Sequence, residues 1–281
     1  MIGIALALAS ALGFGVSDFV GGIASRRVAA LRVVLVSYPV ALVLLLVLAL
    51  IVGGDVSHGA MFWGGLCGVS QAFGVWWFYA ALGAGPISVV SPLTAILVAA
   101  IPVGVGLASG ERPGAIAGVG VVLALAAVVL VSRDAADEDI TPHKFTTKVA
   151  WLTVGSGIAF GLNFVLIAQA PPEAMLWPLV FARLAASVLV LAIAGVTANL
   201  RAPTGTPLRL AFLAAVLDAA ANVAMLFALQ ASLLSLAGVL MSLYPAATVL
   251  LAIVVLRERV TRPQAVGMAV ALISVAMIAS A

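Results

Sequence analysis

The chain has 281 residues, of which 65% are hydrophobic and 8% are charged. Soluble domains carry roughly a quarter charged residues, so this composition excludes a soluble globular fold and predicts a membrane protein. The formal net charge of +3 belongs to basic residues scattered over short loops, so it predicts no nucleic-acid partner.

Apolar runs of about twenty residues follow one another along the chain, and each is long enough to cross the hydrocarbon core as a helix. We predict ten spans, near 2–24, 28–52, 60–83, 86–108, 113–132, 148–169, 174–198, 207–230, 232–256 and 262–280. The first run lacks a basic leading region, so we expect a retained helix rather than a signal peptide. The sequence therefore predicts an all-α, multi-pass protein of the cell membrane.

An internal repeat divides the chain at its one extended polar segment, RDAADEDITPHKFTTK at 133–148. A shift of 147 residues superimposes several identical residues without a gap, among them the dipeptides Glu111-Arg112 and Glu258-Arg259. We therefore predict one five-helix repeat at 1–132, a polar linker at 133–147 and a second repeat at 148–281. Because each copy has an odd number of helices, the second must be inverted in the membrane, as in many secondary transporters.

The motifs of the two halves resemble the EamA-type branch of the drug/metabolite transporter superfamily. In the first half they are Gly85-Pro86 and a long apolar helix that ends in Gly110-Glu111-Arg112. The second half repeats them as Ala228-Leu229, Tyr244-Pro245 and Leu256-Arg257-Glu258-Arg259, followed by Gln264 and Gly267. The resemblance covers both repeats and implies a secondary transporter for amino acids, other metabolites or drugs. One departure is Val98, where the family has a proline, so we expect the kink to be displaced.

The orientation in the membrane is left open by two indicators that disagree. Basic residues cluster after the odd-numbered runs, at Arg26, Arg27, Arg32, Arg133, Lys144, Lys148, Arg201, Arg209, Arg257, Arg259 and Arg262. By the positive-inside rule, this bias places both termini outside the cytoplasm. The family resemblance implies the opposite, with both termini in the cytoplasm.

Polar side chains within the predicted spans are the candidate functional residues, because a charge at the bilayer centre costs at least ~2.5–3.5 kcal/mol. The shift of 147 pairs Gln71 with Asp218, and the segments GFGVSDFV and AFGLNFVL align Asp18 with Asn163. Arg32 and Arg183 occupy comparable places in the second helix of each copy. Asn222 lies one helical turn after Asp218 and shares its face. The predicted substrate site comprises Arg183, Asp218, Asn222, Gln71, Asn163, Asp18, Arg32, Trp77 and Tyr79.

Structural roles compete with these assignments. Asp18 and Arg32 could neutralise each other across the first helical hairpin. Arg183 has no local partner within its repeat, so either a ligand carboxylate or Asp218 could serve. Asn222 could join helices beside a protonated Asp218, and aromatic residues in membrane helices more often pack than bind. We expect Glu111 and Glu258, at helix ends beside arginines, to staple their own turns.

Motifs for other activities do not occur in the sequence. It contains no P-loop, no His or Cys at metal-ligand spacing and no GxSxG, so we expect no enzyme activity, cofactor or metal site. We expect export of a small metabolite such as an amino acid, by alternating access at a central cavity, with a coupling proton carried by Asp18 or Asp218. The alternative is a flippase for a lipid-linked intermediate, or a membrane assembly component. Substrate, coupling ion, direction and oligomeric state, monomer or homodimer, are left open.

Overall fold

The computed structural model describes residues 2–25, 27–84, 87–133, 146–197, 200–256 and 262–280. Within these ranges the ordered elements are helices, and no β-strand occurs. This all-helical structure agrees with the composition, because each backbone amide in a hydrocarbon environment must be bonded inside its own segment or a closed barrel.

The helices follow the apolar runs closely. The first half contains α1 (Ile2–Ser25), α2 (Ala30–Val52), α3 (His58–Ala84), α4 (Ile87–Ala108) and α5 (Ala115–Arg133). The second half contains α6 (Thr147–Ala168), the short 3-10 helix η1 (Pro172–Ala174), α7 (Trp177–Val196), α8 (Thr206–Ala231), α9 (Leu234–Met241), α10 (Tyr244–Leu256) and α11 (Arg262–Ser280). Every predicted run except 232–256 therefore coincides with one helix.

The run 232–256 forms two helices, so the prediction of one continuous helix there is wrong. α9 ends at Met241 and α10 begins at Tyr244. Pro245 gives the physical reason, because it has no N–H to donate to the carbonyl four residues earlier. The last turn of α9 is closed by Ser242, whose backbone N–H and Oγ both donate to the Gly238 carbonyl, at 3.0 Å and 2.7 Å.

Five of the described helices are long and apolar enough to cross a membrane: α1, α2, α6, α7 and α8. The described apolar parts of α4, α5 and α11 are shorter. The multi-pass character of the chain thus has direct support, while the number of ten spans stays a prediction.

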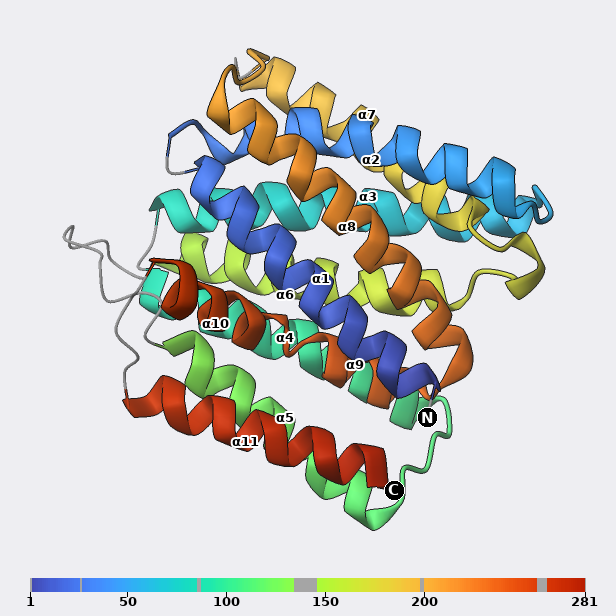
Figure 1. The fold of residues 1–281 in the computed structure, drawn as a ribbon, viewed down its shortest axis with the longest axis vertical. Coiled ribbons are helices and arrows are strands. Elements are labelled where there is room, and N and C mark those ends of the chain that lie inside the picture. Colours follow the sequence, from blue (N-terminus) through green and yellow to red (C-terminus); the bar gives the residue numbers. More distant parts are fainter. Residues whose placement is uncertain are drawn as a thin grey trace.

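The helices form one bundle in which segments from the two halves lie side by side. Figure 1 shows α1 and α8 crossing in front of α3 and α6, with α5 and α11 together at one edge. Both chain termini lie at one end of the bundle, with the connections 53–57, 109–114, 169–176 and 232–233. We call this the termini end. The described connecting residues 27–29 and 200–205 lie at the opposite end.

Small residues allow α1 and α8 to pack closely in antiparallel directions. Ser10 Oγ donates to the Ala221 carbonyl and Ser17 Oγ to the Ala214 carbonyl, each at 3.0 Å. A Cβ on Gly13 would lie 2.8 Å from the Ala221 Cβ, so glycine is required at this contact. In lipid the hydrophobic effect does not drive helices together, so close packing and interhelical hydrogen bonds of this kind hold them in contact.

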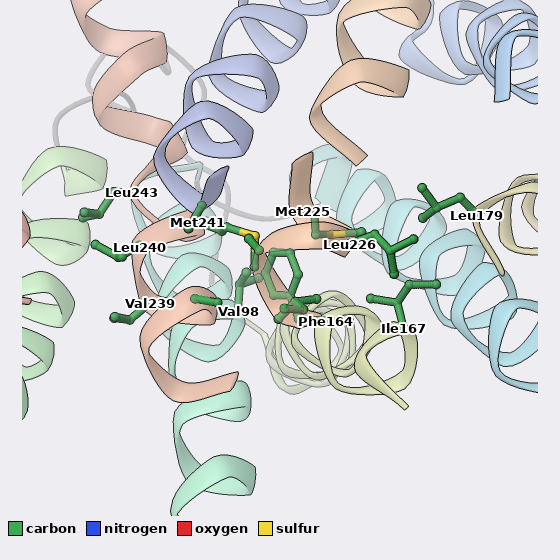
Figure 2. Close-up of a cluster of buried hydrophobic side chains, with 14 of the residues drawn as sticks. Val98, Phe164, Ile167, Leu179, Met225, Leu226, Val239, Leu240, Met241 and Leu243 are labelled. Carbon is green, nitrogen blue, oxygen red and sulfur yellow. The ribbon is translucent and has the colours of Figure 1, made fainter. Parts of the chain in front are cut away.

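The apolar core is densest toward the termini end. Figure 2 shows part of this cluster, with Met225 and Leu226 of α8, Phe164 and Ile167 of α6, and Met241 of α9 near Phe164. Met225, Leu226 and Ile167 are fully buried. Because these residues come from the second halves of α6 and α8 and from α9, the cluster packs helices of the second repeat against one another.

Candidate functional site

The centre of the candidate site is an ion pair between α7 and α8. Arg183 Nη2 donates to Asp218 Oδ2 at 2.6 Å. The Arg183 side chain is 2% exposed and the Asp218 side chain 21%. A contact this short is a charge-assisted hydrogen bond, which is stronger than one between neutral groups. The alternatives left open for Arg183 are thus settled within the protein, where its partner is Asp218.

One donor of the Arg183 guanidinium remains available. Its Nη1 is buried and has no hydrogen-bond partner among the described residues. The guanidinium carbon lies 4.6 Å from the centre of the Tyr38 ring, a cation–π geometry that fixes the plane of the guanidinium. An unpaired buried donor costs about 1–3 kcal/mol, so an acceptor that reached Nη1 would be bound favourably.

Tyr38 was not among the residues predicted for the site. It lies in the middle of α2, and it is the only aromatic residue of that helix. That isolation in an aliphatic segment is the one signal in the sequence that could have identified it. A periodicity argument assigns Tyr38 to packing, because nothing in the sequence places α2 against α7.

Asn222 lies beside the ion pair, on the same face of α8 as Asp218. Its Nδ2 donates to the Asp218 backbone carbonyl at 2.7 Å, and the side chain is 5% exposed. The one-turn spacing in the sequence is therefore realised in the structure. This bond holds the Asn222 amide next to the turn of α8 that carries the carboxylate.

Asp18 reaches the same region from α1. Its side chain is exposed, and its carboxylate lies within electrostatic range of Asp218 and of Tyr244 at the start of α10. The described residues Asp18 and Arg32 form no ion pair with each other, and the buried Nε of Arg32 has no hydrogen-bond partner there. The pairing across the first hairpin is therefore not formed, and Asp18 belongs instead with Asp218.

Asn163 connects two helices. Its Nδ2 donates to the Cys67 carbonyl at 3.2 Å and lies 3.0 Å from the Cys67 Sγ, and both residues are buried. Cys67 is in turn within electrostatic range of Arg183. Asn163 thus holds α6 against α3 directly behind the ion pair.

The remaining predicted residues lie on α3. Gln71 is half-buried, one turn beyond Cys67. Trp77 packs against α6, since a Cβ on Gly155 would lie 2.9 Å from its Cε3, and its ring centre is 5.2 Å from that of Phe73. This is the packing role that aromatic residues commonly have in membrane helices. The side chain of Tyr79 lies outside the described residues.

A groove of about 240 Å³ lies between α3 and α7. Its lining is apolar and includes Phe73, Trp76, Leu189 and Ile193. None of the predicted site residues lines it, and it presents no polar group that could orient a substrate. The groove is therefore separate from the Arg183–Asp218 centre.

Comparisons with known proteins give a consistent result. The model of the EamA-like transporter family matches the chain twice, at residues 1–133 and 147–280. A solved crystal structure described only as that of a protein superimposes with a TM-score of 0.75 over 98% of this chain and 95% of that one. It shares 15% sequence identity, so the likeness concerns the fold alone. No curated protein matches the chain.

Proposed function

The chain belongs to the EamA-like transporter family of the drug/metabolite transporter superfamily, and we propose that it exports a small metabolite such as an amino acid by alternating access. Membership in the family makes the chain a multi-pass membrane transporter for a small molecule. The class of metabolite, the outward direction and the mechanism are our proposal.

We propose that residues 1–132 and 148–281 are inverted repeats that move against each other about the central site. The helix contacts support this arrangement, because a contact between two helices in one combination recurs between their counterparts in the other repeat. α1 packs on α8 while its counterpart α6 packs on α3, and α2 packs on α8 while α7 packs on α3. Because the two repeats make equivalent contacts, each can take the position of the other relative to the membrane. This gives two arrangements of the transporter, one open to each side.

The observation that carries the proposal is the buried ion pair with its free donor. A buried ion pair is often no more stabilising than apolar residues of the same volume, so fold stability alone gives little reason for Arg183 and Asp218. Intramembrane charges usually mark substrate or ion pathways. The unpaired Arg183 Nη1 is suited to donate to a carboxylate oxygen of the substrate while Nη2 stays on Asp218.

Proton coupling follows from the same contact. A proton taken up by Asp218 removes its negative charge and weakens its bond to Arg183, and loss of the proton restores the ion pair. The protonation state of Asp218 therefore changes the Arg183 site at which the substrate binds. We propose that Asp18 passes the proton between solvent and the pair, and its exposure and its electrostatic interaction with Asp218 support this role.

The alternative function, a flippase for a lipid-linked intermediate, needs a polar site that opens sideways to lipid. The groove between α3 and α7 is lined by apolar side chains and contains none of the candidate site residues. This groove therefore gives the alternative function no support.

The proposal is tested by exchange of labelled amino acids and related metabolites in proteoliposomes that contain the purified protein. We expect saturable exchange of at least one such compound in the wild type, abolished in Arg183→Ala and retained in Arg201→Ala, which removes an exposed arginine. Exchange that survives Arg183→Ala would exclude Arg183 from the site. Movement of lipid-linked compounds without exchange of any soluble metabolite would support the alternative.

A further inference from the structure

Glu111 makes a contact between the two halves of the chain. It lies in the connection between α4 and α5, and its carboxylate accepts two backbone hydrogen bonds from the start of α9. Leu234 N donates to Oε1 at 2.7 Å and Ser235 N donates to Oε2 at 3.0 Å. The first N–H groups of a helix have no partner within it, and a negative charge there also interacts favourably with the helix dipole.

The chain around Glu111 is shaped for this contact. Gly110 has a φ of +95°, a left-handed conformation that turns the chain back onto α4, where Glu111 N donates to the Gly106 carbonyl at 3.0 Å. A Cβ on Gly106 would overlap the Glu111 carboxylate and lie 3.1 Å from Ser235 N. Glycine at 106 is therefore what lets the carboxylate fit between α4 and α9. The expectation that Glu111 staples only its own turn is corrected by this geometry.

The cap of α9 depends on Glu111. The residue that precedes the helix, Leu233, offers no side-chain hydrogen bond, whereas most helices are capped by a residue adjacent in sequence. If α9 moved away from α4, its free amides and the Glu111 carboxylate would both need water. The contact is thus stable where water is excluded and easily exchanged where water enters.

The contact between Glu111 and α9 lies where it could control the opening of the termini end. Glu111 and the start of α9 both lie at the termini end (Figure 1), and the later residues of α9, among them Leu240, belong to the apolar core. α9 is also separated from α10 by the break at Ser242 and Leu243, so it can tilt as an independent unit. The large buried apolar cluster lies on this side of the bundle, whereas Asp18, seven residues before the end of α1 at the opposite end, is exposed.

We propose that Glu111 is a latch between the repeats, which keeps the termini end closed while its carboxylate caps α9 and which is released when that end opens. The inference rests on the proposed alternating access, since only a protein that opens and closes this end needs a reversible contact there. The latch sets the population of the closed state and takes no part in binding the substrate.

The single cysteine, Cys67, is a native reporter of that opening. It is 2% exposed and lies on α3 roughly 14 Å along the helix from His58 at the termini end. The experiment measures how fast a charged maleimide modifies Cys67 in the full-length protein in lipid nanodiscs. Glu111→Gln removes the charge of the latch, and Gly106→Ala displaces the carboxylate without changing the charge.

Two matched controls are available in the chain. Gly104→Ala adds a Cβ to the same helix, where nothing lies within 4 Å, and Glu173→Gln removes an exposed carboxylate at the same end. We expect Glu111→Gln and Gly106→Ala to react at least about fivefold faster than wild type. Loss of a helix cap shifts the equilibrium between the closed and open states by about this factor, and the reaction rate follows the population of the open state. Both controls should react at the wild-type rate.

Thermal unfolding of each variant is measured in parallel. Folded Glu111→Gln and Gly106→Ala proteins that react at the wild-type rate would overturn the latch. Failure of both variants to fold would also overturn it, because Glu111 would then be a static cap. The readout needs no substrate, so the latch can fail while metabolite exchange is intact, and exchange of the tested metabolites can fail while Cys67 still reports the opening of this end.

Discussion

Arg183 and Asp218 are joined by a 2.6 Å bond but are unequally accessible, since the arginine side chain is 2% exposed and the aspartate side chain 21%. A proton that arrives from solvent therefore reaches the aspartate first. Removal of either partner leaves the other charge buried without compensation, yet the two residues should contribute differently to transport. Arg183 is expected to govern substrate affinity, and Asp218 to govern coupling.

The first prediction concerns Arg183→Lys. Lysine keeps the positive charge and can still pair with Asp218, but an ammonium does not reproduce the planar guanidinium that offers Nη1 and Nη2 at once. We expect the variant to fold and its affinity for substrate to fall about tenfold or more, the loss of one charge-assisted hydrogen bond. The measurement is the concentration dependence of exchange in proteoliposomes. Wild-type exchange kinetics in this variant would show that Arg183 does not contact substrate.

The second prediction concerns Tyr38, whose ring lies over the Arg183 guanidinium. Tyr38→Leu removes the aromatic face, which is worth about 0.5–2 kcal/mol to a cation, so substrate affinity should fall roughly twofold to thirtyfold. Tyr38→Phe keeps the ring and should retain more of the affinity than Tyr38→Leu does. Equal effects of the two substitutions would mean that the ring does not position the guanidinium.

The third prediction concerns the seam between α1 and α8. Gly13→Ala places a Cβ 2.8 Å from the Ala221 Cβ, so the two helices must separate and the unfolding free energy should fall by ~1–3 kcal/mol. The control is Gly21→Ala in the same helix, where a Cβ meets nothing within 4 Å. Thermal unfolding in detergent compares the two. A Gly13→Ala protein as stable as the control would show that this seam is loosely packed.

The fourth prediction concerns orientation. Both termini lie at the same end of the bundle (Figure 1), so reporters fused to the two ends must give the same result. The arginine bias predicts that a reporter fused after residue 281 is extracytoplasmic. A cytoplasmic signal would mean that the topology implied by the family resemblance prevails over the local charge bias.

Much of the fold could be predicted from the sequence, because in a membrane protein helix length is set by bilayer thickness and helix ends by polar residues. The boundaries of α1, α8 and α11 follow directly from the apolar runs. The N–H that Pro245 lacks indicates a kink from the sequence alone, but hydropathy does not show that the run divides there into the two helices α9 and α10. The EamA-type resemblance was confirmed by the family match over both halves.

The candidate site could be predicted only in part. Charged residues within apolar spans are recognisable in the sequence because they are costly to bury, but the sequence does not show which residues of other helices contact them. Arg183, Asp218 and Asn222 stood out as polar groups in apolar helices, and the structure brings them together. Asn163 stood out for the same reason, yet it bonds to Cys67 across a helix contact that no sequence spacing indicates. The contact of Glu111 with Leu234 spans the repeats and depends on how the halves are assembled.

The measurement that tests the account most directly is driven transport by Asp218→Asn. Asparagine keeps the shape of aspartate and a hydrogen bond to Arg183 but cannot take up and release a proton. In proteoliposomes with an imposed pH gradient, we predict that Asp218→Asn still exchanges substrate but no longer accumulates it, while the exposed-loop control Asp55→Asn accumulates like wild type. Accumulation by Asp218→Asn equal to wild type at every pH would contradict the account, and would leave the Arg183–Asp218 pair a purely structural contact.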